Sequence, residues 1–298
     1  MFISFQFWML LALGSGIGSL AVDAMRKSIL ITSSDHEWVV MFRLFSYVLP
    51  FVFVWWLISG KQYSVSNIPL FGIALIVGII CEIIAQRHYQ IAVKAMPLSV
   101  CRPMMEMTMI VMIPLSYILL KMPINLHSFG AIIVFLIGIF VINSEGEGSW
   151  VENILKSLRN ENIRSIGWVV LFWSMTTVLQ KVCLQYTNPP FFTLCLSIGL
   201  LLGMIPLLYR NGITVRDIVG SRFDGRYLVS GLVTATMAGL QFSALSYPGA
   251  HPSVVIILKR ASQLAFMVID QRVFRIRITF TRVLGNLLAF AGIVLIAL

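Results

Sequence analysis

The chain of 298 residues is 58% hydrophobic and only 11% charged, and its formal net charge is +10. Soluble domains carry about 25% charged residues, so this composition excludes a soluble domain of useful size and indicates a polytopic membrane protein. It also excludes a nucleic-acid partner despite the positive charge, because the chain has no soluble basic face to present.

Ten apolar runs approach the roughly 20 residues that a helix needs to cross the hydrocarbon core. Turn residues such as Asn188-Pro189-Pro190 punctuate the short connections between them. The longest polar stretch, 144–164, predicts a linker between two five-helix units, 1–143 and 165–298. In chain order, the predicted spans are 5–24, 38–59, 70–89, 98–120, 126–142, 166–186, 191–208, 227–245, 254–273 and 280–298.

The two units resemble each other. Because five spans per unit is an odd number, the second unit must enter the membrane in the opposite orientation. We therefore predict an all-α integral membrane fold with ten transmembrane helices, arranged as two inverted repeats around a central cavity. The residues of the first unit that recur in the second at one constant offset are Gln86, Ala95, Pro97, Val100 and Gly130, matched by Gln241, Ala250, Pro252, Val255 and Gly285.

The basic residues predict an orientation. Most of the 22 Lys and Arg residues lie in or beside odd-numbered loops, whereas only Lys61 and Lys121 lie in even-numbered ones. The positive-inside bias then places the odd loops in the cytoplasm and both termini outside. We expect a plasma membrane, the inner membrane of a bacterium, with an organelle membrane as the alternative.

Lys259 and Arg260 lie side by side in the middle of a predicted span, where each cation costs roughly 2.5–3.5 kcal/mol on insertion scales. Neither these residues nor Lys181 has a carboxylate three or four positions away in its own helix. They must meet carboxylates from other helices or face a wet cavity that receives an anion. Gln263 shares their helix face and Tyr186 offers a hydroxyl, so both are predicted to contact the rest of the substrate.

Arg43 and Arg102 are further intramembrane cations that could assist anion binding. Asp23 with Lys27, and Arg102 with Glu106, are spaced four apart on one helix face, and each predicts a gating or structural ion pair.

Glu82 has no local partner and is expected to meet a cation on a neighbouring helix.

Enzyme chemistry has no sequence support. The chain contains no P-loop, no HExxH motif and no nucleophile elbow, and its four cysteines lack metal-ligand spacing. We predict free thiols, no metal, no cofactor and no enzymatic activity.

The two half-endings resemble the drug/metabolite transporter superfamily, of the EamA-like, ten-helix, two-repeat type. They are Pro114-Leu-Ser-Tyr followed by Gly130 and Gly138, and Phe266-Met-Val-Ile-Asp270 followed by Gly285 and Gly292. Arg43 and Lys27 are also similar to residues common in that family. Lys121-Met122 and Asp270-Gln271 stand where the family often has Gly-Glu. The family usually keeps both termini in the cytoplasm, opposite to the loop charges here.

A narrower resemblance concerns the ninth span. Lys259-Arg260 is similar to the Lys-Arg pair with which plastid phosphate-sugar translocators bind phosphate, and Lys181 to a third phosphate-binding lysine of that branch. Nucleotide-sugar transporters also often carry a lysine there. The resemblance implies a phosphorylated passenger.

The sequence therefore predicts a secondary transporter that moves an organic anion, a sugar phosphate or nucleotide sugar, by alternating access, with exchange of one anion for another. One alternative is a flippase for a polyprenyl-phosphate-linked sugar or another anionic lipid. A second is an exporter of amino acids, drugs or metabolites whose charges are paired internally. A non-transporting membrane subunit or enzyme is a third. The expected partners are the small or lipid-linked anion and membrane lipids, and a homodimer is left open.

Overall fold

The computed structural model describes residues 7–33, 35–60, 65–105, 107–121, 130, 133–134, 136–138, 141, 161–219, 224–248, 250, 252–259 and 265–297. All regular elements within these residues are α-helices, as the sequence predicts. Residues 144–160 of the predicted linker 144–164 and most of the predicted fifth span lie outside the described residues, and the last four residues of that linker form the start of a helix.

The first half contributes α1 (Phe7–Thr32), α2 (Glu37–Ile58), α3 (Ile68–Ala95), α4 (Leu98–Met105) and α5 (Thr108–Leu120). Local chemistry sets several of these ends. The Asn67 side chain accepts a hydrogen bond from the backbone N–H of Leu70 and caps the start of α3. Helix α5 ends where Lys121 adopts a left-handed conformation, with φ of 55°.

The second half contributes α8 (Glu161–Leu184), α9 (Pro189–Arg210), α10 (Val215–Val219), α11 (Gly225–Ser246), α12 (Pro252–Lys259), α13 (Ala265–Arg272) and α14 (Phe280–Ala297). Asn188 and Asp224 cap α9 and α11 through their side-chain oxygens. Proline at the first helical position of α9 suits a site where no intrahelical N–H bond is lost.

Six described helices, α1, α2, α3, α8, α9 and α11, are long and apolar enough to cross a bilayer, which makes the chain an integral, multi-pass membrane protein. The predicted span 98–120 is two helices, α4 and α5. The predicted span 254–273 comprises α12 and α13, and Arg260 and Gln263 lie outside the described residues between them. The count of ten spans stays a prediction.

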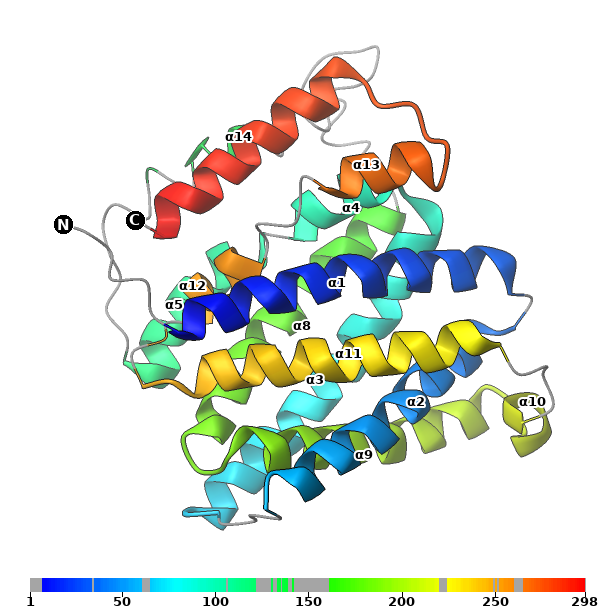
Figure 1. Cartoon of the computed structure of the whole chain (residues 1–298), viewed down its shortest axis with the longest axis vertical. Helices are drawn as coiled ribbons and strands as arrows, with labels where there is room; N and C mark the ends of the chain where they lie inside the picture. The colour runs from blue at the N-terminus through cyan, green and yellow to red at the C-terminus, as the bar shows by residue number, and fades with distance from the viewer. Residues whose placement is uncertain are drawn as a thin grey trace.

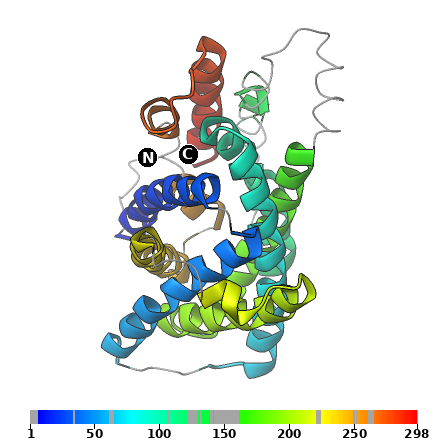
Figure 2. The same ribbon diagram turned by 90° about the vertical axis from the view of Figure 1, so that its right-hand side faces the viewer.

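The long helices pack against one another in pairs. Helix α1 lies along α11, α3 lies along α8, and α2 packs on α9 (Figures 1 and 2). Small residues permit the closest approaches: a Cβ on Gly16 would collide with the backbone carbonyl of Lys259, and a Cβ on Gly231 with that of Tyr47. These contacts bring α12 onto α1 and α11 onto α2.

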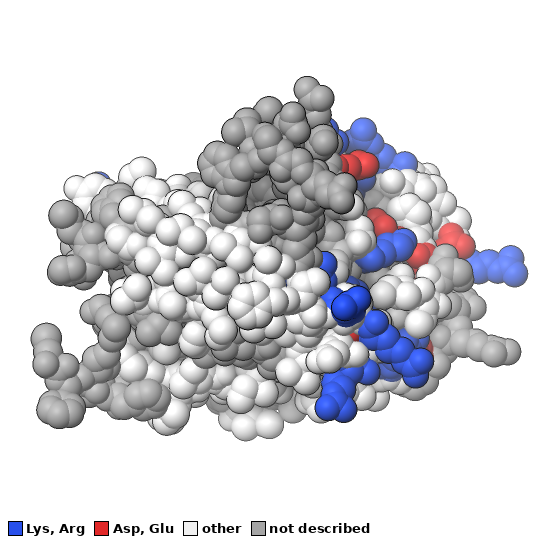
Figure 3. All heavy atoms as spheres, turned by 90° about the horizontal axis from the view of Figure 1, so that it is seen from above, with Lys and Arg blue, Asp and Glu red and all other residues white. Residues whose placement is uncertain are grey.

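Charged side chains gather at one end of the molecule. Figure 3 shows Lys, Arg, Asp and Glu at the right-hand end of the visible face, while the described surface to the left is largely uncharged. In Figure 1 this end holds the end of α1, the start of α11 and the short helix α10, whereas α1 begins and α14 ends at the opposite side. The arrangement agrees with the loop charges, which separate a basic end from the two chain ends.

Candidate functional site

A cavity of about 160 Å³ lies among the helices, lined by residues from both halves of the chain. Its charged lining comes from four helices: Asp23 and Arg26 from α1, Glu82 from α3, Arg102 from α4 and Lys259 from α12. Thus Arg102, Lys259, Asp23 and Glu82, which the sequence singles out, come together around one space.

Asp23 is the centre of a buried ion pair. Its carboxylate accepts hydrogen bonds from the Arg102 guanidinium and the Tyr89 hydroxyl, and all three side chains are almost fully buried. The Arg102 guanidinium also lies over the Tyr89 ring, 4.9 Å from its centroid. Two hydrogen bonds from different helices satisfy this carboxylate, and one of them comes from a cation.

The predicted pairing of Asp23 with Lys27 is wrong. Lys27 instead donates to the backbone carbonyl of Met96 at 2.7 Å and lies 5.0 Å from the Phe274 ring centroid. The physical reason is that a pair four apart gains only a few tenths of a kcal/mol, whereas a buried carboxylate gains more from two donors on other helices. Glu106, the predicted partner of Arg102, lies outside the described residues.

Glu82 belongs to a second polar chain. The Arg26 guanidinium donates to the Gln86 side-chain oxygen at 2.6 Å, and the Gln86 amide nitrogen donates to Glu82 Oε1 at 2.6 Å. The Trp173 indole N–H donates to the same oxygen at 3.3 Å. The cation expected near Glu82 is therefore Arg26, held one amide away rather than in a direct ion pair.

Lys259, on α12, lines the same cavity. Its ammonium donates to the Gln241 side-chain oxygen at 2.6 Å, and the residue is buried. Gln86 and Gln241 are the two glutamines that occupy matching positions in the sequence repeat. Each accepts a hydrogen bond from a cation beside the cavity, Arg26 in one half and Lys259 in the other.

Arg26, Gln86 and Gln241 are not among the residues predicted for the site. Their signal in the sequence is the recurrence of a glutamine at one offset within two apolar helices, because a buried amide needs a polar partner. The partner itself lies on a different helix, so helical spacing does not reveal it.

Three residues predicted to bind the substrate do not line the cavity. Lys181 is buried and donates to the backbone carbonyls of Leu245 and Tyr247, the latter at 2.7 Å, so it caps the end of α11. Tyr186 lies just after α8, where its carbonyl accepts the backbone N–H of Ser66 at 3.0 Å.

Arg43 is the third of these residues. It donates to the carbonyls of Asp217 at 2.6 Å and Ile218 at 2.9 Å, and its guanidinium pairs with Asp35 at 2.5 Å. Arg43 thus ties α2 to α10 at the basic end.

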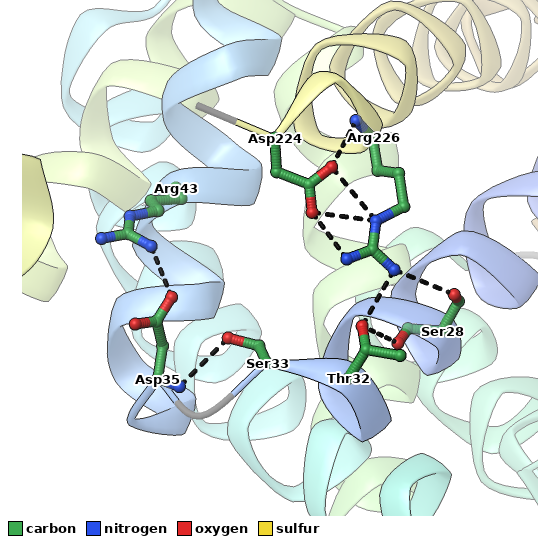
Figure 4. Close-up of polar contacts among 7 residues, drawn as sticks. All are labelled: Ser28, Thr32, Ser33, Asp35, Arg43, Asp224 and Arg226. Carbon is green, nitrogen blue, oxygen red and sulfur yellow. Dashed lines mark hydrogen bonds and ion pairs between the residues drawn. The ribbon is translucent and has the colours of Figure 1, made fainter. Parts of the chain in front are cut away.

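A neighbouring network joins α11 to α1 at the same end (Figure 4). The Arg226 guanidinium pairs with Asp224 at 2.6 Å and donates to the hydroxyls of Thr32 at 2.9 Å and Ser28 at 3.2 Å. Hydrogen bonds from Arg226 hold the pKa of the Asp224 carboxyl below its ordinary value. Figure 4 places this group beside the Arg43–Asp35 pair, so polar contacts fasten α1, α2, α10 and α11 at the basic end.

Within the described residues, the protein is an all-helical, multi-pass membrane protein with charged groups around an internal cavity. Residues 166–298 match the EamA-like transporter family. This match to the second half of the chain is consistent with the predicted resemblance to the drug/metabolite transporter superfamily.

A solved structure titled "Crystal structure of protein" has a similar fold, with a TM-score of 0.64, 12% sequence identity and coverage of 96% of this chain and 98% of that one. No protein of curated function matches the chain.

Proposed function

We propose that the protein is a secondary transporter that moves an organic anion, a phosphorylated one in the first instance, by alternating access. The observation that carries this proposal is the charged lining of the cavity. Among the described lining residues, Arg26, Arg102 and Lys259 stand against Asp23 and Glu82, a formal excess of one positive charge. A cavity inside a membrane protein with an excess cation favours a passenger that brings a negative charge.

The contacts of two cations support the same conclusion. Arg26 donates to the side-chain oxygen of Gln86 and Lys259 to that of Gln241, so each cation has a neutral amide among its partners. Hydrogen bonds between two charged groups are roughly twice as strong as neutral ones. An incoming phosphate or carboxylate would therefore be a better acceptor for both cations than the amides it replaces.

The cavity volume favours a compact passenger. About 160 Å³ of space accessible to water leaves room for several water molecules. A small phosphorylated metabolite is therefore the first passenger to test.

Packing supports two inverted five-helix repeats, in which α4 with α5 and α12 with α13 each count as one span. Under the sequence repeat, α1 corresponds to α8 and α3 to α11, and the packing of α1 on α11 then corresponds to that of α8 on α3. Lys27 near the end of α1 binds a carbonyl beyond the end of α3, and Lys181 near the end of α8 binds carbonyls at the end of α11. A two-fold relation between the halves accounts for both the matching helix contacts and the matching lysine contacts.

The proposed orientation follows the loop charges, with the basic end in the cytoplasm of a cell whose plasma membrane holds the protein. The proposed mode includes exchange, because a bound anion neutralises the excess charge each time the cavity reorients.

A thermal-stabilisation screen of the purified protein tests the substrate class. Its arms are sugar phosphates, inorganic phosphate, nucleotide sugars, a polyprenyl phosphate in detergent and neutral amino acids. We expect stabilisation by compact anions, and we expect Lys259→Gln to reduce it. Lys94→Gln is the matched control, because Lys94 is half-exposed and pairs with Glu37 outside the cavity. Stabilisation by neutral or cationic compounds alone would defeat the proposal, and stabilisation by the lipid phosphate alone would favour a flippase.

A second candidate, an exporter of zwitterionic metabolites such as amino acids, has one observation in its favour. The Arg102–Asp23 pair is satisfied within the protein, and Glu82 offers a carboxylate to an ammonium group. Uptake of labelled amino acids into vesicles that survives Lys259→Gln would support it, because such a substrate needs no excess cation.

A further inference from the structure

Two carboxylates line the cavity, and they have different surroundings. Asp23 is buried and forms an ion pair with the Arg102 guanidinium. Glu82 is half-buried and receives both of its hydrogen bonds on Oε1, from the Gln86 amide and the Trp173 indole. Among the described residues, Glu82 makes no ion pair and its Oε2 has no hydrogen-bond donor. Neutral donors on one oxygen leave the other able to take a proton.

The charged and titratable groups around Glu82 come from several helices. Helix α1 presents Asp23 and Arg26, α4 presents Arg102, α12 presents Lys259, and α3 itself presents Cys81 and Tyr89. Arg26 and Lys259 attract the ionised carboxylate through space. The described cavity residues of α2, α5, α8, α9 and α11 do not titrate. One proton on Glu82 therefore raises the formal charge of the lining from one excess positive charge to two.

We propose that Glu82 is a proton-binding site and that its protonation is coupled to anion binding, so that the protein carries a proton together with the anion. The inference rests on the proposed function, since it assumes an anionic passenger. A proton from water bonds to Glu82 Oε2, the anion binds beside Arg26 and Lys259, and both leave at the opposite face. With one proton and one monovalent anion bound, the cavity has the same formal charge as when it is empty and deprotonated. Proton-coupled transport with an empty return is then an alternative to the exchange mode proposed above, because the empty cavity and the loaded cavity carry the same formal charge.

Gln86 links Glu82 to Arg26 and so connects proton binding to anion binding. Its amide nitrogen donates to Glu82 while its oxygen accepts from Arg26. Protonation removes the charge from the acceptor and weakens the bond that holds Gln86 in place. Arg26 then loses a fixed partner and turns to the anion. Proton binding and anion binding therefore favour each other, and linkage makes the effect reciprocal.

Tryptophan fluorescence provides a direct test, because the Trp173 indole donates to the carboxylate that is proposed to titrate. The purified protein is titrated between about pH 4 and about pH 9, with and without sodium sulfate, whose charge does not change over this range. We expect a fluorescence transition that disappears in Glu82→Gln and in Trp173→Phe and returns with an altered midpoint in Glu82→Asp. Glu161→Gln is the matched control, because Glu161 is an exposed carboxylate at the start of α8, and it should leave the transition unchanged.

Sulfate should move the midpoint upward by about one pH unit, which corresponds to about tenfold tighter anion binding to the protonated form. Thermal unfolding of each variant at one pH establishes that it is folded. A transition that persists in Glu82→Gln overturns the proposal, and so does a Glu82-dependent transition that sulfate does not move. Failure of the proposed function looks different: sulfate and the compact anions of the screen would then stabilise neither the parent protein nor Glu82→Gln at any pH.

Discussion

Removing the positive partner of the buried Arg102–Asp23 pair should cost more stability than any exposed charge in this protein. In Arg102→Gln, the Asp23 carboxylate keeps the Tyr89 hydroxyl as a donor but loses its cation. Arg102 is 4% exposed and Asp23 2%, so water cannot replace the lost partner without rearrangement. Breaking a buried pair in this way costs about 3–5 kcal/mol, whereas an exposed pair contributes about 0–1 kcal/mol.

The assay is the midpoint of thermal unfolding in one detergent. At about 2–4 °C per kcal/mol for a chain of this size, Arg102→Gln should lower the midpoint by about 10 °C. Asp23→Asn combined with Arg102→Gln should cost less than the sum of the single changes by about 2 kcal/mol, since no isolated charge remains. Lys94→Gln is the exposed comparison, because the Lys94 side chain is 49% exposed in its pair with Glu37. Equal shifts for Arg102→Gln and Lys94→Gln, or strict additivity in the double variant, would refute the buried-pair reasoning.

Three further outcomes are expected in the same unfolding assay. Lys181→Met should lower stability by about 1–3 kcal/mol, because it leaves two carbonyls at the end of α11 without their shared donor, and an unchanged midpoint would contradict this capping role. Gly16→Ala should destabilise the protein by forcing α1 away from α12, while Gly72→Ala, which has open space for a Cβ, should not; equal effects would remove the close-packing argument. Asp224→Ala should cost about 1 kcal/mol of N-cap stability. Because Arg226 lowers the pKa of Asp224, the stabilisation is complete above the unfolded pKa of about 4 and is lost as the pH falls below it, and Asp224→Asn should remove that acid sensitivity.

The sequence predicts the helical class and most helix positions, because apolar length is a direct consequence of bilayer thickness. The predicted runs 38–59, 70–89 and 191–208 correspond to α2, α3 and α9 within a few residues, apart from a longer end to α3. Apolar length does not reveal that 98–120 is two helices, because hydropathy measures apolar content and not backbone conformation. The repeat and the orientation of the halves rest on spacing and loop charge, and the packing of α1 on α11 and α8 on α3 supports them.

The charged residues of the cavity are identifiable from sequence because ions are rare in lipid-spanning segments. Their partners are not, since partners are set by tertiary packing. Asp23 was expected to pair along its own helix, but its donors come from α3 and α4. Lys181 is as conspicuous in the sequence as Lys259, yet it binds carbonyls at the end of α11 while Lys259 lines the cavity. A cation in a predicted span therefore indicates a buried side chain that has hydrogen-bond acceptors. Only the packing of the helices decides whether these acceptors are backbone carbonyls or groups beside a cavity that a ligand can replace.

The proposed duplication would combine a nearly symmetric frame with an asymmetric site. Gln86 and Gln241 are equivalent positions, and each accepts a hydrogen bond from a cation. Both carboxylates, however, lie in the first half, where the repeat places Val178 and Met237 at the matching positions of the second. Among the described cavity residues, both carboxylates thus lie in the first half, and the Trp173–Glu82 hydrogen bond connects the two halves. A proton on Glu82 weakens a bond that motion between the halves would break, so the same event that makes the cavity more positive also eases its reorientation.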